Sequence, residues 1–145
     1  MPTTWILAAN RSHARIFSAD TPAAGLTEVE SLLHEEGRLH EGDLVSDGPG
    51  ISSGVAGRGG NQMNRDETAR HQEAQQFGRQ ICGLLDEGLR QKRFDQLYIL
   101  CEPGFLGLIR PILSPGLKQH LKSEIQKNLV AQTPEEIRSA LPQYL

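Results

Sequence analysis

The sequence predicts a single α/β domain built on a mixed five-stranded sheet with helices packed on it. Three observations carry this prediction. Short apolar runs typical of strands recur along the chain, a long helical pattern separates two of them, and a segment of roughly thirty residues without either pattern interrupts the order. At 145 residues the chain can bury one core without disulfides or metals. We find no internal repeat and no linker, so residues 1–145 are predicted to be one domain.

Composition limits the partners and the compartment. The net charge is −3 and the isoelectric point about 5.9, so any binding of nucleic acid or an anionic membrane requires a local patch. Both cysteines, Cys82 and Cys101, lie inside apolar patterns, which is typical of buried thiols in a reducing compartment. The apolar run at residues 5–9 is too short for a signal peptide or a membrane span. We therefore expect a cytoplasmic protein that does not contact a membrane.

The first two predicted strands form a hairpin. Residues 5–9 are continuously apolar, which indicates a central strand covered on both faces. A turn-like sequence at residues 10–12 follows, and residues 14–18 are predicted to be the returning strand.

A third strand is predicted from Leu26 to His34. Val29, Ser31 and Leu33 are expected to share one side and the glutamates between them the other, the alternation of a half-exposed edge strand. The three strands then form an antiparallel meander.

A glycine-rich loop is predicted from about residue 36 to residue 65. Connections of this length are far longer than the usual ~4–6 residues and are generally functional or disordered. The first half is acidic, whereas Arg58 and Arg65 lie in a second half with no acid between Gly48 and Arg65. Two interpretations stay open: a binding tip, and a solvated tip whose glycines only allow the chain to turn.

A long helix is predicted to begin at Asn64 and to run to Arg93. Asn64 and Glu67 have the spacing of a capping box. The first turns are mostly polar, so we expect them to project beyond the sheet toward the loop. A buried stripe begins further along and consists of Phe77, Ile81, Leu84, Leu85 and Leu89.

The remaining elements follow in regular order. A strand after the long helix favours a parallel crossover that returns beside the first strand. Each later helix is predicted at a proline, the residue preferred at the first helical position. The predicted elements are a strand at 94–101, helices beginning at Pro103 and at Pro115, a strand at 121–126, and a helix from Pro134 to Leu141.

Several sequence motifs, together with this order of elements, resemble those of the bacterial host-attachment protein family. The motifs are WILAANRSHARIF at 5–17, Phe77, FDQLYIL at 94–100 and PGFLGLIR at 103–110. This family is similar to the middle domain of archaeo-eukaryotic peptide release factors and their Pelota relatives, which has a ribonuclease-H-like arrangement. The resemblance covers nearly the whole chain, and it implies the sheet order 3-2-1-4-5 with the first three strands antiparallel.

The same resemblance draws attention to the end of the loop. In those release factors the loop before the long helix carries Gly-Gly-Gln, which helps water attack peptidyl-tRNA. This chain has Gly59, Gly60, Asn61 and Gln62 at the corresponding place. The extra Asn61 displaces Gln62 by one residue, and effective catalysis requires placement of a reacting water to within about an ångström. The resemblance therefore implies binding in preference to chemistry at this loop.

The leading hypothesis is a non-catalytic module that binds ribosomal RNA or tRNA through the glycine-rich loop. One alternative is a protein-interaction factor with an indirect role in attachment to host cells. Another is a peptidyl-tRNA hydrolase with Gln62 as its catalytic residue. Basic side chains suit phosphate and glycines permit close backbone approach. The candidate RNA-binding residues are Arg58, Gly59, Gly60, Asn61, Gln62, Arg65, Arg70, Arg110 and Lys118.

Other chemistry is disfavoured. A two-metal nuclease needs several acids at strand ends, but Asn10 closes the first strand and Glu102 alone closes the fourth. The histidines and acids between His34 and Asp43 do not have the spacing of a known metal site. Neither cysteine has a histidine at a recognisable spacing for a thiol nucleophile. We expect no metal and no cofactor, and the sequence does not indicate an oligomeric state.

Overall fold

The computed structural model describes residues 3–34 and 59–145, and within the long helix it describes side chains from Thr68 onward. The predicted order of elements is confirmed for these residues. The elements are β1 (Thr4–Ala9), β2 (His13–Ala19), β3 (Thr27–Leu33), α2 (Gly59–Arg90), β4 (Gln96–Cys101), α3 (Pro103–Ile109), α4 (Pro115–His120), β5 (Leu121–Ile125) and α5 (Pro134–Ser139).

All five strands belong to one sheet in the order β3-β2-β1-β4-β5, as predicted. Strands β1, β2 and β3 are antiparallel, whereas β4 runs parallel to β1 and β5 runs parallel to β4. The central position of β1 follows from its sequence, because all six of its residues are buried. The predicted parallel return after the long helix is confirmed by the pairing of Ala9 with Cys101.

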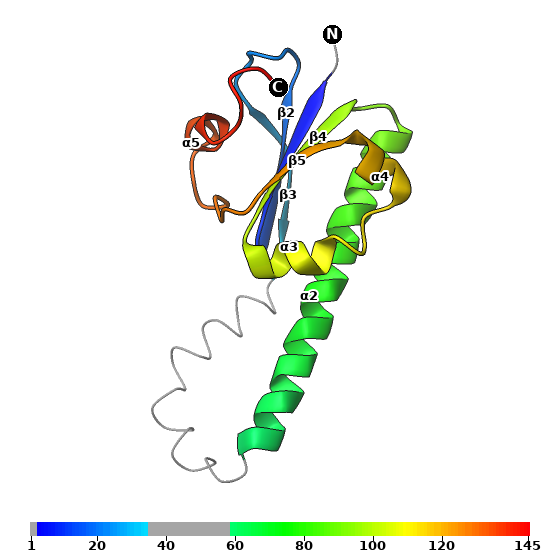
Figure 1. The fold of residues 1–145 in the computed structure, drawn as a ribbon, viewed down its shortest axis with the longest axis vertical. Coiled ribbons are helices and arrows are strands. Elements are labelled where there is room, and N and C mark those ends of the chain that lie inside the picture. Colours follow the sequence, from blue (N-terminus) through cyan, green and yellow to red (C-terminus); the bar gives the residue numbers. More distant parts are fainter. Residues whose placement is uncertain (1–2, 35–58) are drawn as a thin grey trace.

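The sheet lies between two helical layers (Figure 1), with α2, α3 and α4 on one face and α5 on the other. The larger core joins the first layer to alternate residues of the strands and includes Phe77, Ile81, Phe94 and Phe105. The smaller core lies under α5 and includes Phe17, Tyr98 and Ile137. The residues of β1 therefore alternate between the two cores along the strand.

Helix α2 begins at Gly59, so the prediction of a helix start at Asn64 is wrong. The Asn64–Glu67 pair lies inside the helix. Residues 61–65 include Gln, Met and Arg, which are good helix formers, and contain no proline, so nothing in their chemistry stops the helix from extending toward the glycines. Gly59, Gly60, Asn61 and Gln62 thus form the first helical turn instead of a loop tip. Within the described residues, no helix is long and apolar enough to cross a membrane.

Helix α2 also ends earlier than predicted, at Arg90. Lys92 has a φ of 58°, the left-handed conformation that terminates helices. The Arg93 amide donates to the Gly88 carbonyl at 2.8 Å and the Lys92 amide to the Leu89 carbonyl at 3.0 Å, which closes the last turn. A Cβ on Gly88 would lie 2.6 Å from the Trp5 ring, so this helical position requires glycine.

Strand β3 is half-exposed as predicted, but its inward residues differ from the prediction. Val29 and Leu32 pack against the larger core, whereas Leu33 is 50% exposed. The register with β2 shifts at Val29, which has no partner. A bulge of this kind reverses the alternation of sides beyond it. The prediction that Leu33 shares a side with Val29 is therefore wrong.

The three short helices begin where the prolines predicted. The residue before each proline is an N-cap whose side chain accepts a backbone amide: Glu102 from Phe105, Ser114 from Leu117, and Thr133 from Glu136. Helix α5 ends at Ser139, two residues before the predicted end at Leu141. These caps fix the direction in which the chain leaves β4 and the β5 segment.

Candidate functional site

The carboxyl ends of β1, β4 and β5 meet at one edge of the sheet, here called the carboxyl edge. Ligands of open α/β sheets generally bind outside such an edge. Figure 1 shows that α3 lies across this edge and that the N-terminal part of α2 continues beyond it, away from the sheet. The carboxyl edge and this projecting helix are therefore the natural place to look for a functional site.

Asn10, at the end of β1, is used to build the turn. Its Oδ1 accepts hydrogen bonds from the Ser12 amide at 2.9 Å, the Ser12 hydroxyl at 3.1 Å and the His13 amide at 2.9 Å. Its Nδ2 donates to Oδ1 of Asn128 at 3.2 Å. The carboxamide oxygen thus holds the backbone of the turn and the nitrogen joins the turn to the Asn128 side chain, which leaves Asn10 with a structural role.

Glu102, at the end of β4, is also committed to structure. Its Oε1 accepts the Phe105 amide at 2.9 Å and lies 3.8 Å from Nε of Arg11. The carboxylate therefore caps α3 while an exposed guanidinium partly neutralises it. In the part of the chain that the structure describes, no group of three or more His, Cys, Asp or Glu side chains could hold a metal ion.

An aromatic stack anchors α2 where it leaves the body. The His34 ring lies 4.9 Å from the Phe77 ring at an interplanar angle of 13°, and Phe77 lies 5.9 Å from Phe105. His34 is held in turn by Arg11 and Ser12, whose carbonyls lie 3.0 Å from its Nδ1 and 2.8 Å from its amide nitrogen. The stack joins the end of β3 to α2 and α3, and it fixes the direction of the projecting helix.

Ala74 is the first fully buried residue of α2 among its described side chains. We call residues 59–73 the α2 arm. At 1.5 Å per residue the arm is about 22 Å long. Its sequence is polar, with Met63 and Ala69 as its apolar residues apart from the glycines.

The predicted RNA-binding residues do not form one group. Gly59, Gly60, Asn61, Gln62, Arg65 and Arg70 lie on the arm, and Arg58 lies outside the described residues. Lys118 lies on α4, whose Ser114 hydroxyl bonds to Asp86 of α2 at 2.6 Å. Asp86 is sixteen residues from Arg70, or roughly 24 Å along the helix, so Lys118 and Arg70 belong to different ends of the molecule.

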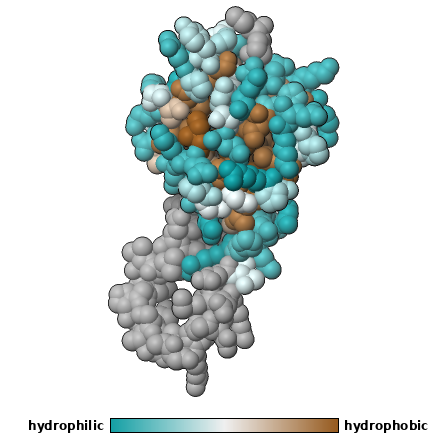
Figure 2. All heavy atoms as spheres, viewed as in Figure 1, coloured by the Kyte–Doolittle hydropathy of each residue, from teal (hydrophilic) through white to brown (hydrophobic). Residues whose placement is uncertain are grey.

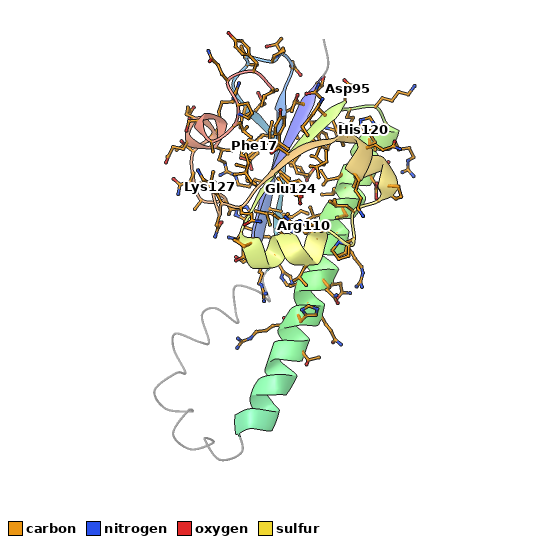
Figure 3. All side chains as sticks on the ribbon, viewed as in Figure 1. Phe17, Asp95, Arg110, His120, Glu124 and Lys127 are labelled. Atoms are coloured by element: carbon orange, nitrogen blue, oxygen red, sulfur yellow. The ribbon has the colours of Figure 1, made fainter. Side chains whose placement is uncertain are left out.

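Arg110 is engaged within the body. Its Nε donates to Oε2 of Glu124 at 2.9 Å, an ion pair between the end of α3 and β5. Figure 3 shows the two side chains beside each other at the front of the molecule. Arg70, Arg110 and Lys118 therefore do not form one positive face.

Two arginines that the sequence analysis did not single out hold the smaller core closed. Arg15 on β2 donates to the carbonyls of Val130 and Gln132, both at 2.8 Å. Arg138 on α5 donates to four backbone carbonyls, those of Pro22, Ala24, Pro142 and Gln143, beside a shallow pocket that includes Tyr144. The contacts with Val130, Gln132, Pro22 and Ala24 span more than one hundred residues of sequence, and no local pattern indicates them.

The two thiols are unsuited to nucleophilic chemistry. Burial raises the pKa of Cys82 to about 12, and the nearby Asp86 carboxylate adds to the effect. Burial likewise raises the pKa of Cys101 to about 12, with smaller contributions from Glu102 and Glu124. Because the thiolate is the reactive form, both groups are inert in the folded protein.

We therefore expect neither cysteine of the native protein to react with a soluble disulfide reagent at neutral pH, and both to react after unfolding in guanidinium chloride. Rapid modification of one thiol without denaturant would contradict the burial. The folded thiols keep their protons to about pH 12, whereas unfolded thiols lose them near 9.0. Ionisation of the thiols should therefore favour the unfolded state, so the free energy of unfolding should fall as the pH rises above about 9.

Comparison with known proteins gives one result on family and none on close relatives. No curated protein matches the chain. A family model described as "Protein required for attachment to host cells" matches residues 5–141, from β1 to the segment that follows α5. This span includes all the elements described above except Thr4, the first residue of β1. The chain therefore belongs to the family of proteins required for attachment to host cells.

Proposed function

We propose that the chain is a non-catalytic binding module that engages ribosomal RNA or tRNA through the α2 arm and the residues just before it. The observation that carries the proposal is the arm, a polar helix about 22 Å long that extends past the carboxyl edge. Helical stability in proteins comes mostly from packing of an apolar face, and a polar extension of this length is marginal by itself. A partner that packs against the arm would supply the tertiary contacts that stabilise a helix and that the arm does not make with the sheet.

The side chains of the arm suit RNA better than an apolar protein groove. Arg58, Arg65 and Arg70 lie within thirteen residues of sequence, and carboxamides at 61, 62, 64 and 72 lie among them. Guanidinium groups suit phosphate and carboxamides suit base edges. The order of elements around the arm is also the one implied by the resemblance to release-factor middle domains.

A protein partner is the second candidate, because the acidic residues of the arm outnumber its arginines by three to two. Asp66, Glu67 and Glu73 offset Arg65 and Arg70, so the arm itself does not present a strong positive field. This candidate accords with an indirect role in attachment to host cells. It predicts a complex whose affinity depends little on salt, whereas phosphate contacts weaken steeply with added salt.

The test is co-sedimentation with ribosomes at low and at high salt, with two charge-reversal variants. Arg70→Glu on the arm should weaken the association and reduce the slope of log affinity against log salt by about one. Lys118→Glu is the matched control, because Lys118 is an equally charged, exposed residue far from the arm, and it should leave the association unchanged. Absence of association at low salt would exclude this RNA partner, and equal effects of the two variants would exclude the arm.

A further inference from the structure

The two edges of the sheet differ in the sign of their charges. Edge strands present unpaired backbone groups with which another strand can pair, and charges and bulges restrict that pairing. Both edges contain a register shift, at Val29 in β3 and at Lys122 in β5, so the charges distinguish the two edges. Strand β3 carries two exposed glutamates, Glu28 and Glu30, along one edge. Strand β5 forms the other edge, and among the described residues no strand pairs with its outer side.

Strand β5 is flanked by apolar side chains in both layers. Leu108, Ile112 and Leu121 are partly buried on the side of α3 and α4, and Ile125 and Leu129 are partly buried on the side of α5. Figure 1 shows β5 at the front of the sheet, and Figure 2 shows brown apolar surface in this part of the same face. The free strand edge therefore lies between two apolar borders, a composition suited to burial in an interface.

The charges of β5 are self-complementary. In an antiparallel pair of two β5 strands centred on Ser123, Lys122 of each copy lies opposite Glu124 of the other. Lys122 is exposed, and the register shift with β4 places it in a bulge without a partner on β4. By contrast, β3 carries acidic residues and no basic one, so two β3 strands would repel each other.

We propose that β5 pairs with β5 of a second copy of this chain about a two-fold axis near Ser123, which joins the two sheets into one. The Arg110 ion pair holds the Glu124 carboxylate at the edge, where Lys122 of the second copy meets it. Such an interface is isologous, so each apolar and charged contact occurs twice. This pairing is independent of the RNA partner proposed above, because the arm and β5 are different surfaces.

The test is the mass of the purified full-length protein in solution, measured by sedimentation equilibrium over a wide range of concentration. The native chain should approach twice its 16.0 kDa mass. Lys122→Glu places four acidic side chains at the junction and should weaken dimerisation by about tenfold or more, given the cost of like charges opposite each other in a sheet. Glu30→Lys, an equally exposed charge reversal on β3, is the matched control and should not change the mass.

Each outcome decides the proposal. A dimer that Lys122→Glu dissociates and Glu30→Lys leaves intact supports pairing through β5. A chain that stays monomeric at the highest concentration overturns it, and so does a dimer that responds equally to both variants or to neither. Circular dichroism of both variants establishes that a change of mass is not a loss of folding.

Discussion

Replacing Phe77 by alanine is expected to lower the free energy of unfolding by about 3–5 kcal/mol. Phe77 is 1% exposed and lies between His34 and Phe105, so truncation removes a buried ring and opens a cavity that three elements line. The loss is measurable by urea unfolding followed through Trp5, the single tryptophan, which stacks on Phe94 in the larger core.

The matched control for Phe77 is its exposed neighbour on the same helix. Gln76→Ala should change the stability by less than about 0.5 kcal/mol, because it removes no buried group and keeps a good helix former. Phe77→Leu should retain much of the buried volume and fall between the two. If Phe77→Ala were no more costly than Gln76→Ala, the aromatic stack would not anchor α2.

The elements that sequence predicted well are those whose signals are local. A continuous apolar run makes β1 a central strand, and a polar residue before a proline marks the start of α4 and α5 through the caps Ser114 and Thr133. These signals act within a few residues, so they need no knowledge of the neighbours. The order of the strands came from the family resemblance, and the pairings confirm it.

The boundaries and sides of elements were less predictable, because several local solutions compete. The capping spacing at Asn64 and Glu67 is a valid start, yet the helix extends to Gly59 through residues that tolerate helix equally well. One unpaired residue at Val29 exchanges the roles of Leu32 and Leu33. A single sequence does not distinguish a bulge from regular alternation.

The candidate site shows the same division. The polar arm beyond the sheet was predictable from the helical stripe, which begins only near Phe77. The distance between Arg70 and Lys118 was not predictable from the sequence, since it depends on where α4 packs along α2. The structural roles of Asn10 and Glu102 could not be predicted either. A polar residue at the end of a strand looks the same in sequence whether it binds a ligand, holds a turn or caps a helix.

Replacing Arg15 by alanine is expected to lower the free energy of unfolding by about 2–3 kcal/mol. The side chain is 15% exposed, its guanidinium lies 4.9 Å above the Phe17 ring, and it bonds both oxygens of Glu28 at 3.0 and 3.2 Å. It also holds the carbonyls of Val130 and Gln132. Truncation leaves two partly buried carbonyls without this donor, and their desolvation is then uncompensated.

A lysine at this position should rescue little, because one ammonium group cannot reach Glu28 and both carbonyls in the fork geometry of guanidinium. Arg90→Ala is the matched control: the Arg90 side chain is 74% exposed and pairs with Glu87 at the surface, so its loss should cost less than about 1 kcal/mol. Equal losses for Arg15→Ala and Arg90→Ala would mean that the segment over the smaller core is held by its apolar contacts alone. A larger loss of stability for Arg15→Ala would show that this guanidinium holds residues 128–132 on the sheet. These residues follow β5, the strand that is proposed to pair with a second copy.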